Sequence, residues 1–268
     1  MRLKNKLSRL KKILLKSGSC VIAFSGGADS AFLLKTASLV LPKAKILAVT
    51  ANSATYPKEE LILAKKIAGT FGAKHKIINT AELKNKRFIA NTRQRCYFCK
   101  KELFTKLKDI ARQNKLVFVF DASNISDKSD FRPGEKAKKE LGIRSPLQEA
   151  GITKADIRTL SKRLGLLTWN KPAQACLASR IPYGINISKP ILNRINKAEN
   201  FLKKLEFSQV RVRHYNGLCR IEVPKNKIAR LFNKSQSLID KLKKIGYNYV
   251  TVDLEGYRVG SLNEVVKK

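Results

Sequence analysis

Residues 21–34, "VIAFSGGADSAFLL", combine an apolar run, a pair of glycines and a second apolar run. The first run predicts a short buried strand and the second predicts a helix. Between them, Gly26 and Gly27 allow the backbone to turn sharply and to approach a ligand closely. The first turn of a helix has free N–H groups and a partial positive charge, which suit a phosphate. The motif therefore predicts a phosphate-binding loop between a strand and a helix.

Strand and helix patterns alternate on both sides of this loop. Nearly continuous apolar strands joined by helices are typical of a parallel sheet that helices cover on both faces. The predicted fold class is therefore α/β. We expect strands at 20–24, 44–50, 73–79 and 115–123, and helices at 29–40, 57–71 and about 99–112.

The pattern changes after "IPYG" at residues 181–184. A helix is expected near 188–205, and alternating residues on both sides of Asn216 and Gly217 predict an antiparallel hairpin. We expect residues 1–183 to form the α/β domain with the phosphate loop. Residues 184–268 are expected to form a smaller α+β domain that binds substrate and takes part in a homo-oligomer.

The 268 residues carry a formal net charge of +36. Because Lys, Asn and Ile are abundant throughout, this charge is typical of a biased composition combined with anionic small-molecule substrates. An RNA-binding surface is the alternative. The apolar runs are shorter than the about 20 residues of a membrane span, and the N-terminal residues lack a secretory apolar core. The five cysteines form no disulfide framework. We therefore expect a cytoplasmic protein without a membrane segment.

Ser25, Asp29 and Ser30 add chemistry to the loop. The two hydroxyls can donate to a phosphate, whereas the Asp29 carboxylate suits a Mg²⁺ ligand or a helix cap. The loop lacks the Gly-Lys-Ser/Thr of a kinase-type P-loop and the G-x-G-x-x-G of dinucleotide binders. It resembles the SGGxDS loop of ATP pyrophosphatases, with Ala28 in place of the usual Val. The resemblance implies that the loop binds ATP, which is cleaved between its α and β phosphates.

Cys96 and Cys99 form a C-x-x-C pair. This spacing is found in metal sites and in redox couples, and it also occurs without either role. A closed zinc site needs four ligands, and neither His75 nor His214 has ligand spacing. The spacing alone does not decide among these alternatives.

A third cysteine, Cys176, is expected on a loop four residues before Arg180. A nearby guanidinium favours the thiolate, which is the nucleophilic and metal-binding form. A small buried core residue is the alternative. Cys20 and Cys219 are expected to pack in the core.

Five segments together resemble the LarE-type ATP-dependent sulfur transferases, and they cover nearly the whole chain. They are "RCYFCKKELF" (95–104), "SDFRPGEKA" (129–137), "RSPLQEAGITKADIR" (144–158), "ACLASRIPYG" (175–184) and "YVTVDLEGYRVGSLNE" (249–264). The resemblance implies that ATP, with Mg²⁺, adenylates a carboxylate of pyridinium-3,5-biscarboxylic acid mononucleotide and releases pyrophosphate. Sulfur then replaces an oxygen, and AMP leaves as a thiocarboxylate forms. Two rounds give the precursor of the nickel-pincer nucleotide cofactor.

The same resemblance implies a role for the three cysteines. Family members with three cysteines hold a 4Fe–4S cluster that carries the sulfur, and members with one cysteine give up its sulfur and keep dehydroalanine. Cys96, Cys99 and Cys176 match the first form, so we expect them to ligate a 4Fe–4S cluster supplied by a sulfide donor. Sacrifice of Cys176 is the alternative. Cys176 and Asp29 are the expected catalytic residues.

Arginines in the second domain are expected to bind the substrate. Arg211 and Arg213 alternate to one strand face, where two guanidiniums suit a phosphate; a solvated strand face is the alternative. The resemblance implies that both bind the ribose phosphate of the substrate. Glu199 and Glu222 match acidic family positions near the active site, with ordinary salt-bridge partners as the alternative. Arg180 is assigned to the same substrate site.

The segment "DASN" at residues 121–124 follows a predicted strand. Open α/β sheets bind ligands beyond the carboxyl ends of their strands, so Asn124 is an expected nucleotide-binding residue. Relatives tend to have Gly-Thr where this chain has Ala-Ser. Asp127, Asp130 and Arg132 follow in a polar loop and are candidates for ATP contacts or helix capping.

Three other functions fit parts of the sequence. A 4Fe–4S-dependent tRNA thiolase shares the ATP loop and the cysteines and explains the charge, but it usually carries an additional RNA-binding module or zinc-ribbon cysteines. A nitrogen transferase would not need the three cysteines. A nucleotide sensor without catalytic activity would not need the catalytic groups, and none of them is missing from this sequence. We therefore expect a nucleotide-like small molecule and a sulfide donor as partners rather than a nucleic acid.

Overall fold

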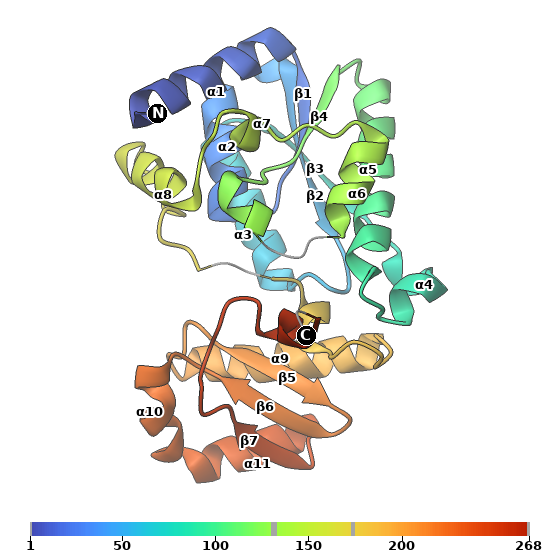
Figure 1. Cartoon of the computed structure of the whole chain (residues 1–268), viewed down its shortest axis with the longest axis vertical. Coiled ribbons are helices and arrows are strands. Elements are labelled where there is room, and N and C mark those ends of the chain that lie inside the picture. Colours follow the sequence, from blue (N-terminus) through green and yellow to red (C-terminus); the bar gives the residue numbers. More distant parts are fainter. Residues whose placement is uncertain (1, 130–132, 173–174, 267–268) are drawn as a thin grey trace. The chain divides into compact units, whose positions relative to one another are not determined.

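The computed structural model describes residues 2–129, 133–172 and 175–266. The chain divides into two compact units, one formed by Met1–Glu82 and Gln94–Gln174 and the other by Leu83–Arg93 and Ala175–Lys268. Figure 1 shows their elements coloured along the sequence. Among the helices that the structure describes, none combines the length and the apolar character needed to cross a bilayer. The functional division into residues 1–183 and 184–268 stays a prediction.

The first unit is built on a parallel sheet with the strand order β3-β2-β1-β4. Cys20 of the central strand pairs with Ile46 on one side and with Phe118 on the other. The predicted α/β fold is confirmed. The strands are β1 (Cys20–Ala23), β2 (Ile46–Asn52), β3 (Lys74–Asn79) and β4 (Phe118–Phe120).

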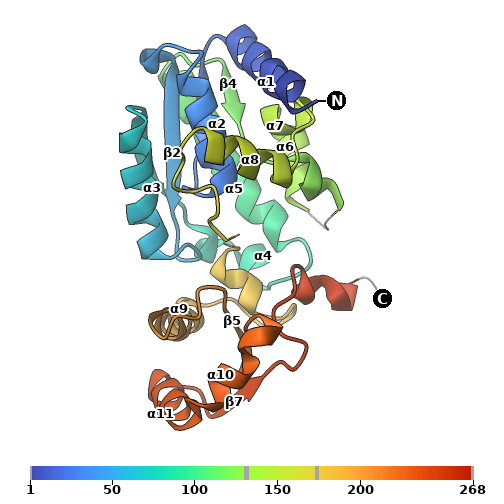
Figure 2. The ribbon, with the colours of Figure 1, turned by 90° about the vertical axis from the view of Figure 1, so that its left-hand side faces the viewer.

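Helices follow the strands of this unit largely where the sequence predicts them. They are α1 (Leu3–Ser17), α2 (Ala28–Ser38), α3 (Lys58–Thr70), α5 (Arg95–Gln113), α6 (Gly134–Leu141), α7 (Pro146–Glu149) and α8 (Lys154–Arg163). Short 3₁₀ helices along the whole chain are η1 (Lys43–Lys45), η2 (Glu82–Lys84), η3 (Ile125–Ser129), η4 (Leu177–Arg180), η5 (Lys225–Lys227) and η6 (Ser261–Val266). Figure 2 shows α3 alongside β2.

Successive residues of β1 point into two different cores. Ile22 packs into a core with residues of α1, α2 and α8, such as Phe32. Val21 packs on the opposite face with Phe104 and Leu107 of α5. Figure 1 shows α1 and α2 on one side of the sheet and α5 and α6 on the other. Because both faces of β1 are covered, apolar residues are needed at each of its positions, which explains its continuous apolar run.

The fourth strand is shorter than the predicted span of 115–123. Lys115 has a left-handed φ of 53°, and the backbone N–H of Leu116 donates to the carbonyl of Ala111 at 2.9 Å. These two residues therefore close α5 instead of beginning the strand. At the other end, Asp121 and Ser123 form a polar turn that takes the chain out of the sheet.

The second unit contains a small mixed sheet. The predicted antiparallel hairpin is confirmed by the pairing of β5 (Arg211–Tyr215) with β6 (Leu218–Glu222), and β7 (Tyr249–Val252) lies parallel to β6. Asn216 and Gly217 have φ values of 42° and 99°, as a tight hairpin turn requires. The helices of this unit are α4 (Lys86–Ile89), α9 (Lys189–Lys204), α10 (Ile228–Phe232) and α11 (Ser235–Ile245).

Residues 83–93 belong to the second unit although they lie between β3 and α5 in the sequence. The buried side-chain amide of Asn91 donates to the carbonyls of Pro182 at 2.7 Å and Ile185 at 2.9 Å. The backbone N–H of Ile187 donates to the carbonyl of Ile89 at 2.9 Å. These long-range hydrogen bonds, which no local pattern indicates, attach the segment to this unit.

Cys20 and Cys219 pack in the two units as predicted. Both side chains are fully buried, and burial raises the pKa of each thiol to about 12. Because the thiolate is the reactive form, both residues are chemically inert.

Candidate active site

The loop at residues 25–30, called the phosphate loop below, depends on its glycines. Gly26 has a φ of 62°, and a Cβ built on it would lie 2.8 Å from the Cα of Ala64 in α3. Only glycine allows this approach in a left-handed conformation without displacing α3. Gly27 is extended and caps the N-terminus of α2. The pair turns the chain from strand into helix, as predicted.

The two serines of the phosphate loop hold it with long hydrogen bonds. The buried hydroxyl of Ser30 accepts from the N–H of Ser25 at 3.3 Å and donates to the carbonyl of Gly27 at 3.2 Å. The exposed Ser25 accepts from the N–H of Gly27 at 3.4 Å. These distances exceed the usual value of about 2.9 Å, so the bonds are readily exchanged for bonds to a ligand.

Two lysines that the sequence reasoning missed contact the phosphate loop. The ammonium group of Lys154 donates to the Asp29 carboxylate at 2.6 Å. That of Lys171 donates to the carbonyl of Gly26 at 3.2 Å and to the Glu60 carboxylate at 2.6 Å. The lysines lie 125 and 145 positions away from the loop residues that they contact. Their only sequence signal is that Lys154 stands in one of the family-like segments and Lys171 shortly before another.

Tyr56 also contacts the phosphate loop, through a hydrogen bond from its hydroxyl to the carbonyl of Ser25. Burial and the nearby carboxylate of Glu60 raise the pKa of Tyr56 above its usual range. The phenol therefore stays protonated and keeps donating. This contact limits the movement of the loop on its strand side.

Asp121, at the carboxyl end of β4, is buried and ionised. Its carboxylate accepts from the hydroxyls of Ser123 and Ser145, each at 2.6 Å, and lies 3.3 Å from the ammonium group of Lys138. Burial by itself raises the pKa of Asp121, but Lys138, Lys100 and the two hydroxyls outweigh it, so that the pKa is lowered. The segment is thus held as a rigid polar turn next to the sheet edge.

Asn124 is buried within this turn. Its side-chain oxygen accepts from the N–H of Ser126 at 2.9 Å, and its own N–H donates to the Asp127 carboxylate at 2.8 Å. Its nucleotide-binding role stays a prediction. Asp130 and Arg132, the other candidates in this loop, lie outside the described residues.

Cys96 and Cys99 lie in the first turn of α5, which begins at Arg95 and therefore earlier than predicted. Both side chains are half-buried, and residues three apart face one side of a helix. Gly134 of α6 lies against this turn, since a Cβ there would be 2.9 Å from the Cγ of Lys100 and 3.6 Å from the carbonyl oxygen of Cys96. The glycine therefore allows α6 to approach the cysteine turn.

Cys176 is exposed and precedes η4, on a loop as predicted. Its backbone carbonyl accepts from the guanidinium of Arg180 at 3.0 Å, so Arg180 fixes the chain at this cysteine. Cys176 belongs to the second unit, and Cys96 and Cys99 belong to the first. In the described ranges no group of three or more His, Cys, Asp or Glu side chains is gathered as a metal site. A cluster shared by the three cysteines stays a prediction.

Arg180 is buried and paired with Glu199. Its guanidinium donates to both carboxylate oxygens, at 2.8 and 2.9 Å, and also to the carbonyl of Ala175 at 2.6 Å. Burial raises the pKa of Glu199, but Arg180, Arg211 and the N–H of Val212 outweigh it and lower the pKa. The carboxylate therefore stays charged inside the unit.

Arg213 forms a second buried pair. It donates to both oxygens of Glu222, at 2.7 and 2.8 Å. It also donates to the Ser179 carbonyl and to the Ser261 hydroxyl, each at 2.6 Å. Glu199 and Glu222 are thus paired with Arg180 and Arg213, and their role near an active site stays a prediction.

Arg211 lies on the same face of β5 as Arg213, whereas Val212 points into the core. Both arginines are only 5% exposed, so the alternative of a solvated strand face is wrong. Burial and the nearby Arg180 lower the pKa of Arg211, and Glu199 opposes this effect. The guanidinium lies 5.4 Å from the centroid of the Tyr257 ring.

The three arginines and two glutamates form one assembly, called the arginine cluster below. It consists of Arg180, Arg211, Arg213, Glu199 and Glu222. Three positive charges stand against two negative ones, so the cluster has a surplus of one positive charge. Such a surplus in a buried environment favours the binding of an anion. The structure brings these predicted residues together, while their substrate-binding role stays a prediction.

Comparisons with known proteins identify the relatives of this chain. No family model matches it. It is 41% identical over 268 residues to an uncharacterized protein of Synechocystis sp., covering 99% of this chain and 100% of that protein. It is 31% identical over 256 residues to an uncharacterized protein of Methanocaldococcus jannaschii, covering 94% and 97%.

A third relative has a named activity. The chain is 38% identical over 247 residues to the pyridinium-3,5-bisthiocarboxylic acid mononucleotide synthase of Lactiplantibacillus plantarum, covering 92% of this chain and 90% of the synthase. Identity at this level over almost the entire length leaves the overall sequence resemblance in no doubt. The chain therefore belongs to the LarE family, which includes this synthase.

Proposed function

We propose that this protein is a sulfur transferase that adenylates a carboxylate of pyridinium-3,5-biscarboxylic acid mononucleotide and converts it to a thiocarboxylate. The observation that carries the proposal is the 38% identity to the bisthiocarboxylic acid mononucleotide synthase over 92% of this chain. The product of the proposed reaction serves nickel-pincer nucleotide biosynthesis. The geometry of the phosphate loop and of the arginine cluster supports it.

The first step uses ATP at the phosphate loop. A carboxylate oxygen of the substrate attacks the α-phosphorus, the bond to the bridging oxygen of the β-phosphate breaks, and pyrophosphate leaves. The N–H groups at the start of α2 and the hydroxyls of Ser25 and Ser30 bind the departing phosphates. The carboxylate of Asp29, now bonded to Lys154, would provide an oxygen ligand for Mg²⁺. Lys154 and Lys171 then neutralise phosphate charge once the nucleotide displaces their present contacts.

The arginine cluster binds the phosphate of the mononucleotide substrate. Arg213 is held by Glu222 and by the Ser179 carbonyl. Its guanidinium is therefore a fixed part of the arginine cluster. Arg211 carries the charge that burial disfavours, and a phosphate next to it relieves that cost. The substrate is thus held at its phosphate while its carboxylate reacts elsewhere.

The cysteines serve the sulfur step. Two thiols on one side of the first turn of α5 have the spacing and the donor chemistry of iron–sulfur ligands, and Cys176 would be the third ligand of a 4Fe–4S cluster. Bound there, such a cluster would supply the sulfide that attacks the acyl-adenylate. The sulfur forms its bond to the carbonyl carbon, the carbon–oxygen bond to AMP breaks, and Arg180 keeps the Cys176 loop in position throughout.

Phosphorus NMR of the products tests the proposal. With ATP, Mg²⁺ and the pyridinium dicarboxylate mononucleotide, we expect pyrophosphate and AMP to appear together with the thiocarboxylate. Asp109→Asn, which changes an exposed carboxylate on α5, is the control and leaves the products unchanged. ADP and orthophosphate as primary products would contradict the proposal.

Intact-protein mass spectrometry identifies the sulfur source. If the cluster carries sulfur, the protein mass stays constant through turnover with sulfide, and Cys96→Ala abolishes sulfur transfer while pyrophosphate release continues. The buried Cys219→Ala is the matched control and retains both steps. A loss of about 34 Da after one turnover, as one H₂S leaves a reactive thiolate, would instead identify Cys176 as the donor.

A further inference from the structure

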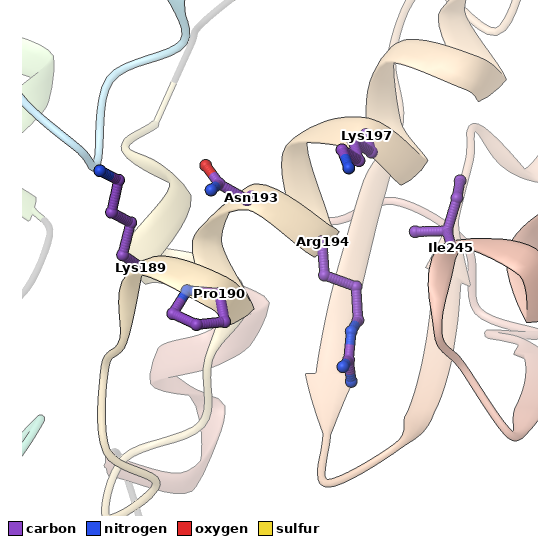
Figure 3. A pocket seen from close by; sticks show the side chains of 6 residues that line it. All are labelled: Lys189, Pro190, Asn193, Arg194, Lys197 and Ile245. Carbon is purple, nitrogen blue, oxygen red and sulfur yellow. The ribbon is translucent and has the colours of Figure 1, made fainter.

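Helices α9 and α11 of the second unit are separated by two adjoining hollows. Figure 3 shows the first, a hollow of about 390 Å³ formed by one face of α9 and by Ile245 at the end of α11. The second has a volume of about 470 Å³ and continues along the same two helices. Because Lys197 and Ile245 line both hollows, they form one groove, called the α9–α11 groove below.

The lining of the α9–α11 groove is strongly basic. No acidic side chain lines either hollow. Each helix has one acidic residue, and both are engaged elsewhere: Glu199 is buried with Arg180, and Asp240 accepts from Gln236. The basic lining residues are Lys189, Arg194, Lys197, Lys204, Lys241 and Lys244.

The amphipathic pattern of α9 arranges these charges in a row. Lys189, Lys197 and Lys204 follow one another at intervals of eight and seven residues, which places them on one face of the helix. Leu192 and Ile195 cover the opposite face in the core. The row spans 15 residue steps, or about 22 Å along the helix axis.

Among the described residues, three of the groove lysines differ from the two lysines at the phosphate loop in lacking a carboxylate partner. Lys154 and Lys171 are paired with carboxylates at 2.6 Å. By contrast, in the part of the chain that the structure describes, no hydrogen bond or ion pair involves the ammonium groups of Lys197, Lys204 or Lys244. A polyanion that lies in the groove relieves the mutual repulsion of these charges.

We propose that the α9–α11 groove binds the phosphate backbone of a nucleic acid strand. The lysines of the row, about 10–12 Å apart along the helix, contact phosphates that are not adjacent in the strand, and the release of condensed counterions supplies most of the affinity. Phe201, partly buried against the core, also lines the second hollow and is an aromatic side chain of the kind on which bases stack. The amide of Asn193 offers hydrogen bonds to a sugar or a base. The binding is independent of the proposed sulfur chemistry and is not sequence-specific.

Fluorescence anisotropy with a labelled 20-nucleotide polyuridylate strand tests this proposal on the full-length protein. We expect a dissociation constant of about 10⁻⁵ M at physiological salt and a slope of log K against log salt near about −4, since each contacted phosphate contributes about −0.7. The triple variant Lys197→Gln, Lys204→Gln and Lys244→Gln should bind at least about tenfold more weakly and should lose about two units of that slope.

A charge-matched variant separates the groove from general basicity. Lys4→Gln, Lys12→Gln and Lys16→Gln remove three exposed charges from α1 in the first unit, and we expect them to change the affinity less than twofold. Equal losses in the two triple variants would overturn the proposal. It would also be overturned by unmeasurable binding of the strand at low salt, or by equally tight binding of polyglutamate, which would identify the groove as a surface for acidic proteins.

Discussion

The phosphate loop is formed by consecutive residues 25–30, whereas the arginine cluster draws its side chains from η4, α9, β5 and β6. In the loop, the polar groups are backbone amides and hydroxyls joined by bonds of 3.2–3.4 Å. In the cluster, the polar groups are charged, buried and joined by bidentate bonds of 2.7–2.9 Å.

This difference indicates whether a substitution in each region affects activity or stability. The loop can exchange its weak internal bonds for a ligand at little cost, so its residues affect activity more than stability. The cluster cannot lose one carboxylate without leaving a buried guanidinium unpaired, which is costly. Substitutions in the two regions should therefore separate catalysis from folding.

The largest expected effect is on stability, in Glu199→Gln. The variant leaves the buried Arg180 without a charged partner, and removing one member of a buried pair costs about 3–5 kcal/mol. Hydrogen exchange of backbone amides at residues 189–223 measures the free energy of opening. The exposed pair of Glu206 with Arg230 is the control, since Glu206→Gln should cost less than about 1 kcal/mol. Similar losses in both variants would show that the cluster is not a buried ionic network.

The next largest effect is on catalysis, in Asp29→Asn. Loss of the carboxylate removes the proposed Mg²⁺ ligand, and we expect pyrophosphate release to slow about 100-fold, or about 2.7 kcal/mol in activation free energy. The stability should change by less than about 1 kcal/mol, because a partly exposed ion pair such as that with Lys154 contributes little. Initial rates and thermal melts measure both quantities. If Asp29→Asn melted at a much lower temperature and kept its rate of pyrophosphate release, the loop residue would serve stability and not catalysis, which contradicts this prediction.

Arg211→Ala tests the substrate side of the cluster. A charge-assisted hydrogen bond contributes roughly 1.5–3 kcal/mol, so the KM for the mononucleotide should rise about tenfold or more, with the KM for ATP unchanged. Arg213→Ala differs, because among the described residues it leaves the buried Glu222 with no charged partner closer than Arg220 at 3.3 Å and therefore destabilises the unit. Steady-state kinetics with each substrate varied in turn measures the two KM values. The partly exposed Arg230→Ala serves as the control. An equal rise for ATP would assign Arg211 to the nucleotide.

The smallest expected effect is a change in acid sensitivity. The pKa of Glu199 is lower in the folded chain than in the unfolded chain, where it is about 4.3. Its stabilising contribution is therefore fully present above about pH 4.3 and is lost as the pH falls through the folded value. The free energy of opening of the second unit should therefore decrease as the pH is lowered below about 4.3. The slope of the opening free energy against pH should be shallower in Glu199→Gln than in the unmodified protein, by at most about 1.4 kcal/mol per pH unit. Identical slopes in the two proteins would show that Glu199 does not titrate with folding.

Local sequence patterns were sufficient for the backbone of both regions. The apolar run before Gly26 and the helix after it specify a strand–turn–helix, because these preferences act over a few residues. The same holds for the hairpin at Asn216 and Gly217, where two left-handed residues are required. The predicted strand at 115–123 was too long because composition does not reveal that Lys115 closes the preceding helix.

Tertiary structure alone decided which charges meet. Lys154 and Lys171 reach the phosphate loop from 125 and 145 positions away, and Arg180 meets Glu199 from 19 positions away. The sequence by itself determined that strand alternation places Arg211 and Arg213 on one face, but not that this face is buried and lies against Glu199 and Glu222. Backbone conformation follows from short-range sterics and periodicity, whereas the pairing of long charged side chains depends on where the packed core brings distant segments together.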